Sequence, residues 1–130
     1  MKIELTEKNK KDLFTLVRSV IAKKLHIQDL PDDSACDFSA PVFDEELGAF
    51  VTLHIGGNLR GCIGFIEGFL PLTETIRQLA LSAAFRDPRF TPLSAEEYPE
   101  IDVEISILSP IEPLENFADI VIGRDGLIAR

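Results

Sequence analysis

A cysteine, an arginine and a histidine lie close together in a segment that is predicted to fold back on itself. Arg60 and Cys62 follow the turn sequence Gly56-Gly57-Asn58, and His54 precedes it. A cation beside a cysteine favours the thiolate, which is the nucleophilic form of the side chain. These residues therefore indicate either a reactive cysteine, activated by Arg60 with His54 in support, or a surface that binds an anion.

The segment that carries them, residues 49–66, alternates between apolar and polar residues and is predicted to form an antiparallel hairpin. Because one face is apolar, the register must keep apolar residues opposite one another, and a three-residue loop does this. The same register places Thr52 opposite Cys62, and His54 opposite Arg60, on the polar face. His54 and Cys62 are then diagonal neighbours, with Cα atoms roughly 7–8 Å apart.

Two glycines, Gly61 and Gly64, flank the thiol in sequence. Glycine inside a strand lowers its stability and often marks a place where a ligand or another backbone comes close. Both glycines are therefore predicted to border a substrate-binding surface. The alternative is structural, because a buried cysteine is a small apolar residue that packs well and is inert. A helix that covered this face would give Cys62 such a role.

A second group of charged residues lies in the segment Arg86-Asp87-Pro88-Arg89. Its proline excludes regular structure, so the segment is predicted to be a loop. One interpretation is that Arg86, Asp87 and Arg89 flank the same pocket as Cys62, where the arginines bind an anionic substrate group. The other is that Asp87 only caps or bridges its own neighbours.

Hydrophobic spacing predicts two helices. Thr6 suits the N-cap of an amphipathic helix over residues 7–25, with His26 after its end, and Pro71 suits the first position of a helix that ends near Phe85. Ser94 and Glu97 have the spacing of a capping box for one short helical turn.

Alternation predicts the strands, which are expected at 49–55, 59–66 and 101–107, with a short strand at 41–43. In the strand at 101–107, the polar residues Asp102, Glu104 and Ser106 are predicted to share a solvent-exposed face. A last hairpin is predicted between 120–122 and 127–129, across Gly123–Gly126. This order of elements indicates an α+β domain with a largely antiparallel sheet flanked by helices.

Composition narrows the classes of function. The chain has 130 residues and a formal net charge of −9, which argues against binding to nucleic acid or to anionic membranes. It has no signal-like start and no long apolar run, and its two cysteines form no disulfide framework, so a cytoplasmic location is expected. Cys36 is expected to be inert, because the charge of the neighbouring Asp37 disfavours a thiolate. No motif for a metal or another cofactor occurs, so none is predicted.

The hexapeptide Leu59–Gly64 resembles the hallmark of the AMMECR-one domain, which is also called AmmeMemoRadiSam system protein A. Other stretches are similar to the same family, so that the resemblance covers nearly the whole chain after the first helix. They are residues 50–53, 84–90 (with the Asp-Pro-Arg-Phe motif), 103–108 and 122–127.

The resemblance implies an α+β fold and a binding or active site at the hexapeptide, and it implies no known reaction. In microbes, proteins of this kind are associated with a Memo-like protein and a radical-SAM protein, which are therefore the expected partners. Domains of the family usually continue well beyond the Gly-Arg-Asp-Gly-Leu stretch. Residues 1–130 are accordingly expected to be a single AMMECR-one-like domain without its C-terminal part.

Two functions follow as hypotheses. In the first, the chain is an enzyme or enzyme component in which Cys62 is the nucleophile or the covalent carrier, and the substrate is an unknown small molecule or protein. In the second, it is a non-catalytic interaction or scaffold module, and the Leu59–Gly64 hairpin is structural. The first requires Cys62 to be accessible beside cations, whereas the second requires it to be buried.

Overall fold

Four antiparallel strands form one sheet in the order β2-β1-β3-β4. The computed structural model describes residues 5–28, 31, 34–110 and 117–126. In chain order the elements are helix α1 (Glu7–Lys24), the 3₁₀ turn η1 (Pro41–Asp44), strands β1 (Ala49–Ile55) and β2 (Asn58–Phe65), helix α2 (Leu72–Phe85), the 3₁₀ turn η2 (Tyr98–Glu100), and strands β3 (Ile101–Pro110) and β4 (Phe117–Gly126). The predicted α+β class is confirmed.

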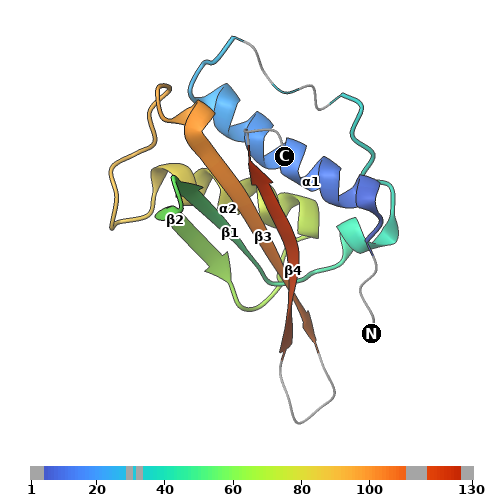
Figure 1. Ribbon diagram of the computed structural model, residues 1–130. Coiled ribbons are helices and arrows are strands. Elements are labelled where there is room, and N and C mark those ends of the chain that lie inside the picture. Colours follow the sequence, from blue (N-terminus) through green and yellow to red (C-terminus); the bar gives the residue numbers. More distant parts are fainter. Residues whose placement is uncertain (1–4, 29–30, 32–33, 111–116, 127–130) are drawn as a thin grey trace.

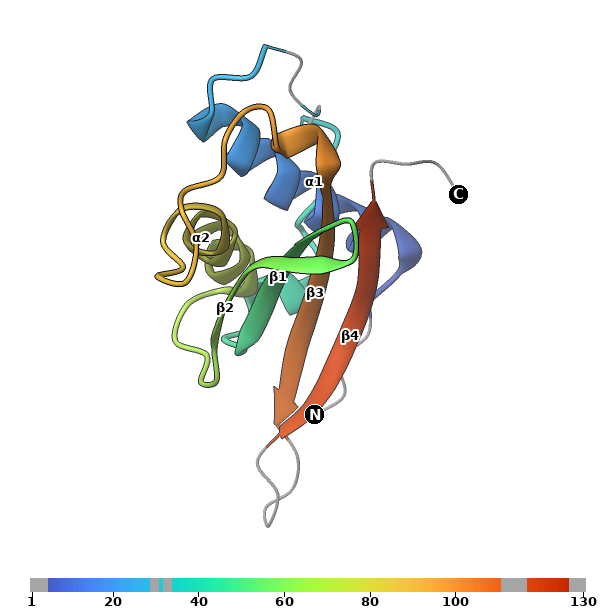
Figure 2. The same cartoon turned by 60° about the vertical axis from the view of Figure 1, so that its left-hand side comes forward.

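Both helices lie on the same face of the sheet, so that the molecule has two layers (Figures 1 and 2). Helix α2 packs against β1 and β2, and α1 packs against α2 and β3. The side chains that the strands direct toward the helices are buried: Ala49, Val51, Leu53, Ile101, Val103, Ile105 and Ile107. Alternate residues of the same strands point to the opposite face, which we call the open face; no described helix covers it.

Helix α1 begins and ends as the sequence predicts. The Thr6 hydroxyl accepts a hydrogen bond from the Asn9 N–H at 3.0 Å, and the Asn9 side chain accepts one from the Thr6 N–H at 3.0 Å. This reciprocal capping box satisfies two N–H groups that have no partner within the helix. Just after the helix, His26 adopts a left-handed conformation with φ of 60°, which ends the helix sharply.

The β1–β2 hairpin confirms part of the predicted register. Thr52 lies opposite Cys62, as expected, but His54 lies opposite Leu59 instead of Arg60. The reason is the turn, since Gly56 and Gly57 have φ of 58° and 83° and form a two-residue turn instead of the predicted three-residue loop. Arg60 is the extra residue of a bulge that restores the apolar register.

Helix α2 and the segment after it also follow the prediction. The four residues expected to point inward, Leu72, Ile76, Leu79 and Ala83, are all buried. Residues 86–92 are irregular, as their prolines require. The Glu97 N–H donates to the Ser94 Oγ at 3.2 Å, and the Ser94 N–H donates to the Glu97 carboxylate at 3.0 Å, which confirms the capping box.

Two predicted elements are wrong. Residues 41–43 belong to a 3₁₀ turn instead of a strand, because Pro41 suits the first position of a helical turn and lacks the N–H that a strand would use. Gly123–Gly126 is part of the single strand β4 instead of a hairpin loop. The long strand β3 offers pairing partners as far as Asp102, and this outweighs the turn propensity of the glycines. Residues 127–129 of the predicted hairpin lie outside the described residues.

Candidate functional site

The Cys62 thiol lies on the open face of the sheet, half-buried, beside the residue that was predicted to oppose it. The Sγ of Cys62 is 3.1 Å from the Oγ1 of Thr52, and either group can be the donor. A hydroxyl at this distance orients a thiol and can donate to a thiolate. The structure therefore gives Cys62 a defined polar neighbour, which the sequence placed at the correct position.

The backbone of Cys62 is held by the loop that carries the Asp-Pro-Arg-Phe motif. The Cys62 N–H donates to the Asp87 Oδ2 at 3.0 Å, and the Arg89 Nη2 donates to the Cys62 carbonyl oxygen at 3.3 Å. Strand β2 is an edge strand, so these two backbone groups have no neighbouring strand to pair with. The loop supplies the missing partners and fixes the position of the cysteine.

Asp87 and Arg89 form a bidentate ion pair within that loop. The Arg89 Nε and Nη2 lie 3.0 and 2.7 Å from the two Asp87 carboxylate oxygens. The hydrogen bonds from the Arg89 guanidinium and from the Cys62 N–H outweigh burial, and they hold the pKa of Asp87 well below its usual range. Asp87 is 3% exposed, so this charge is tied to Arg89 and Cys62. Asp87 thus forms an ion pair with its neighbour Arg89 and also accepts a hydrogen bond from Cys62. Both predicted alternatives, a local bridge and a position beside Cys62, therefore apply to Asp87.

Arg60 engages a residue that sequence reasoning did not single out for the site. Its guanidinium donates to both carboxylate oxygens of Glu97, at 3.0 and 2.9 Å, and to the Thr91 carbonyl oxygen at 2.9 Å. No described hydrogen bond joins it to the Cys62 thiol, so an activating role for Arg60 stays a prediction. The sequence marked Glu97 only as the partner of Ser94 in a capping box, and that spacing does not indicate Arg60 as a further partner.

An aromatic ring connects the two arginines. The guanidinium carbons of Arg60 and Arg89 lie 5.7 and 5.5 Å from the centre of the Phe90 ring. Cations at this distance from a ring are attracted to its electron-rich face. The hexapeptide and the Asp-Pro-Arg-Phe motif, which are distant in sequence, therefore form one interlocked unit at the edge of the sheet.

Packing accounts for the two glycines beside the thiol. A Cβ on Gly61 would overlap the carbonyl oxygen of Ala83, and a Cβ on Gly64 would overlap the ring of Phe50. Helix α2 can approach β2 only because Gly61 has no side chain. A ligand contact at either glycine stays a prediction.

The remaining predicted residues, His54 and Arg86, make no described polar side-chain contact with this cluster. His54 lies on β1 opposite Asp102 of β3, and its Nδ1 is buried without a hydrogen-bond partner in the described residues. Arg86 is exposed at the end of α2, where its N–H donates to the Ser82 carbonyl oxygen. The structure therefore brings Cys62, Asp87 and Arg89 together, and among the described residues no hydrogen bond or ion pair joins the side chain of His54 or Arg86 to them.

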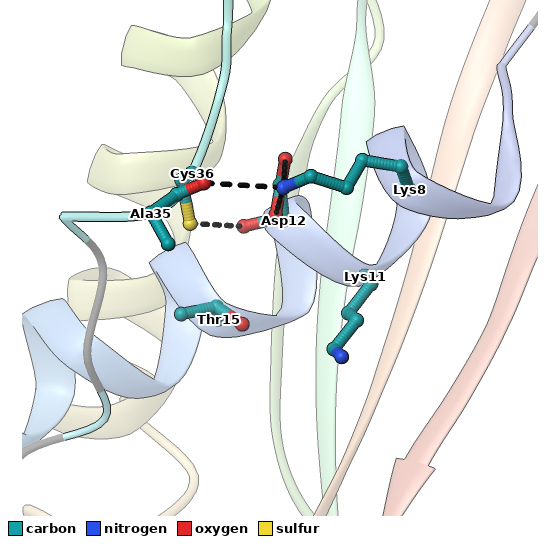
Figure 3. A pocket seen from close by; sticks show the side chains of 6 residues that line it. All are labelled: Lys8, Lys11, Asp12, Thr15, Ala35 and Cys36. Carbon is teal, nitrogen blue, oxygen red and sulfur yellow. Dashed lines mark hydrogen bonds and ion pairs between the residues drawn. The ribbon is translucent and has the colours of Figure 1, made fainter.

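Cys36 lines a different hollow, beside the first turns of α1 (Figure 3). The cavity has a volume of about 340 Å³ and is lined by Lys8, Lys11, Asp12, Thr15, Ala35 and Cys36. Burial disfavours ionisation of Asp12, but the hydrogen bonds from Lys8 and from the Asp37 N–H outweigh it and lower the pKa of Asp12. The neighbours of Cys36 thus include a lysine that sequence reasoning did not consider, and its inertness stays a prediction.

In the part of the chain that the structure describes, no group of three or more His, Cys, Asp or Glu side chains is arranged to hold a metal ion. Among the described helices, neither the length nor the apolar character needed to cross a membrane is found.

The Arg60–Glu97 pair predicts how stability depends on pH. The hydrogen bonds from Arg60 lower the pKa of Glu97 from 4.5 to about 2. The stabilisation is therefore complete above pH 4.5 and is lost as the pH falls toward 2. Glu97→Gln should lower the free energy of unfolding at pH 7 by about 1 kcal/mol, a modest value because this pair is partly exposed to water.

Urea unfolding at pH 7 and at pH 3 measures this effect. The difference between wild type and Glu97→Gln should shrink at pH 3, because the carboxyl of the unfolded chain, with its ordinary pKa of 4.5, is then protonated and must lose that proton to form the ion pair. Glu96→Gln is the matched control, since Glu96 is exposed and should change stability little at either pH. An equal difference at both pH values would contradict the assigned role of Glu97.

Comparison with known proteins places this arrangement in a family. The AMMECR1 family model matches residues 14–130. A protein of Methanothermobacter thermautotrophicus is 47% identical over 105 residues, which cover 76% of this chain and 52% of the relative. A protein of Methanocaldococcus jannaschii is 45% identical over 114 residues, which cover 82% of this chain and 52% of the relative. The chain thus spans about half the length of these curated relatives.

A solved structure shows the same fold. The crystal structure of an uncharacterised protein from Pyrococcus horikoshii superimposes with a TM-score of 0.63 at 31% identity, and the match covers 84% of this chain and 56% of that one. The family model extends over both the hexapeptide and the Asp-Pro-Arg-Phe loop that the structure joins at the edge of the sheet. On these matches, the chain belongs to the AMMECR1 family.

Proposed function

We propose that this chain acts as an enzyme or enzyme component in which Cys62 is the nucleophile or the covalent carrier. One observation supports this most strongly. The Cys62 thiol lies on the open face 3.1 Å from the Thr52 hydroxyl, while Asp87 and Arg89 hold both backbone polar groups of the same residue. A thiol held in one position loses little entropy when it meets its target, which is what a nucleophile requires.

The cations around the thiol have distinct proposed roles. Arg89 is the arginine in contact with Cys62, and its side chain is 56% exposed although it pairs with Asp87. It therefore keeps donor capacity for an anionic group of a substrate, and Arg86 is the second proposed ligand of that group. Arg60 and His54 are proposed to support the reaction from the flanks of the cysteine.

The proposed partners rest on the resemblance of the hexapeptide and the Asp-Pro-Arg-Phe motif. We propose that the component works with a Memo-like protein and a radical-SAM protein. Joint expression of the three chains, followed by purification through a tag on one of the partners, tests this proposal. Recovery of this chain only when the other partner is also present would support a three-component system.

A specific observation favours the second candidate, an interaction or scaffold module. Gly61 and Gly64 each lie where a side chain would overlap a neighbour, and Arg60 is paired with Glu97. Packing and ion pairing thus account for these residues of the hexapeptide without any reaction. That explanation gives the Cys62 thiol no role, so the reactivity of this thiol discriminates between the two functions.

Thiol alkylation is the corresponding experiment. In folded protein at pH 7, iodoacetamide should modify Cys62 faster than Cys36, because the Thr52 hydroxyl, which can donate to a thiolate, lies 3.1 Å from its sulfur and Arg89 is bonded to its carbonyl oxygen. Peptide mapping by mass spectrometry gives the two rates in one reaction, and Cys36→Ser and Cys62→Ser are matched controls. Equal rates, or no modification of Cys62 before unfolding, would remove the nucleophile and leave the scaffold function.

A further inference from the structure

Two large apolar side chains are exposed on the loop between β2 and α2. Ile66 is 60% exposed and Phe69 is 59% exposed. The Phe69 ring also contacts the half-buried ring of Phe65, with 5.2 Å between the ring centres. We call these three residues the loop patch. Single exposed apolar residues are common on protein surfaces, but here the Phe65 and Phe69 rings are in contact and Ile66 directly follows Phe65, a grouping on one loop that is typical of an interaction site.

An acidic segment runs alongside the loop patch. A Cβ on Gly48 would overlap the carbonyl oxygens of Phe65 and Ile66, so the two stretches of backbone are in direct contact. Farther along, Glu46 pairs with Pro71 in an isolated antiparallel bridge. The backbone from Glu46 to Gly48 therefore runs beside the loop that carries the loop patch, with Asp44 and Glu45 directly before it in sequence.

We call the four carboxylates of these two stretches, Asp44, Glu45, Glu46 and Glu67, the acidic rim. In the described part of the chain, none of the four has an ion pair or a side-chain hydrogen bond. No Lys or Arg occurs from residue 25 to 59 or from 61 to 76, so no nearby sequence neighbour can neutralise them. The apolar patch is therefore accompanied by four negative charges that have no described ion-pair partner. Such charges attract cationic groups and repel anionic surfaces.

We propose that the loop patch and its acidic rim dock a basic amphipathic segment of another protein. Apolar side chains of that segment would cover Ile66 and Phe69, and its Lys and Arg side chains would pair with the rim. The same rim argues against an anionic membrane as the occupant. The proposal is independent of the chemistry of Cys62, because it rests on other residues.

The test uses the full chain and a fluorescent synthetic helix that has leucines on one face and lysines on the other. Fluorescence anisotropy should show binding that weakens as salt is added. The variant Ile66→Ser/Phe69→Ser should weaken binding by about tenfold or more, since buried apolar anchors carry most of the affinity of such interfaces. Glu46→Gln/Glu67→Gln should weaken binding and also reduce its dependence on salt.

The control variant Glu96→Gln/Glu100→Gln removes the same charge from exposed positions beside η2 and should change binding by less than about twofold. Ile66→Ser alone is used if the double apolar variant unfolds at a lower temperature, because Ile66 is 60% exposed and its replacement should change stability little. The proposal is overturned if both charge variants weaken binding equally, or if the apolar variants bind as wild type does. Binding to zwitterionic lipid vesicles with the same dependence on Ile66 and Phe69 would also overturn it, and would assign the patch to lipid.

Discussion

Gly61→Val is expected to lower the free energy of unfolding by more than about 2 kcal/mol. The reason is that a Cβ at this position would overlap the Ala83 carbonyl oxygen in the backbone of α2, which cannot move independently of its helix. A decrease in the free energy of unfolding would be informative. Valine has a much higher strand propensity than glycine, so without the overlap it would stabilise β2. Urea unfolding at neutral pH measures the change.

Two further variants sharpen the result. Gly61→Ala should already be destabilising, since the overlap begins at the Cβ. Leu59→Val, at an exposed position on the same strand, should stay within about 0.5 kcal/mol of wild type. If Gly61→Ala proved as stable as wild type, the close approach of α2 would not explain the glycine, and a contact with a ligand would be the better explanation.

Asp87→Ala is expected to lower the midpoint of thermal unfolding by about 5–10 °C. The substitution removes the acceptor for the Cys62 N–H, for the Arg89 N–H and for the Arg89 guanidinium. The edge of β2 is then left with an unpaired backbone group, and the loop loses the ion pair that holds it there. The variant should also change the rate of Cys62 alkylation, because the thiol is no longer fixed in position.

The controls for Asp87 separate charge from hydrogen bonding. Asp87→Asn keeps one oxygen for the Cys62 N–H and loses the charge that pairs with Arg89, so its midpoint should lie between those of wild type and Asp87→Ala. Asp44→Ala removes an exposed carboxylate that has no described partner and should leave the midpoint unchanged. The hydrogen bonds from Arg89 lower the pKa of Asp87, so its contribution persists above the ordinary value of 3.8 and is lost only as the pH falls below it. A midpoint that Asp87→Ala leaves unchanged would contradict this account.

The hairpin shows how far sequence patterns can predict a site. Alternation of apolar and polar residues correctly placed Thr52 opposite Cys62, because a shift by one residue would bury the polar face. The same reasoning failed for His54 and Arg60, because the backbone of two adjacent glycines can form a tighter turn than the pattern alone requires. Side-chain patterns constrain the strands well and the turns poorly.

The contacts of the charged residues were predicted less well from the sequence than the pairing of the strands. Sequence spacing placed Arg60 near Cys62, but the structure pairs its guanidinium with Glu97, which lies 37 residues away along the chain. Bidentate pairing with a carboxylate depends on which loops meet in space, and one sequence contains no signal for that. For the same reason, the contact of Asp87 and Arg89 with the backbone of Cys62 could be suspected from the sequence but not established.

The sequence by itself determined the class of fold, both helices with their buried faces, the strands β1 to β3 and the family. Each of these depends on periodic burial, capping residues or a contiguous motif, which are local properties of the chain. Only the tertiary structure decided that β4 is a single strand, that α2 rests on Gly61, and that the loop at Asp87 completes the edge of β2 at Cys62. These features depend on contacts between distant segments, where the energy of pairing and packing outweighs local propensity.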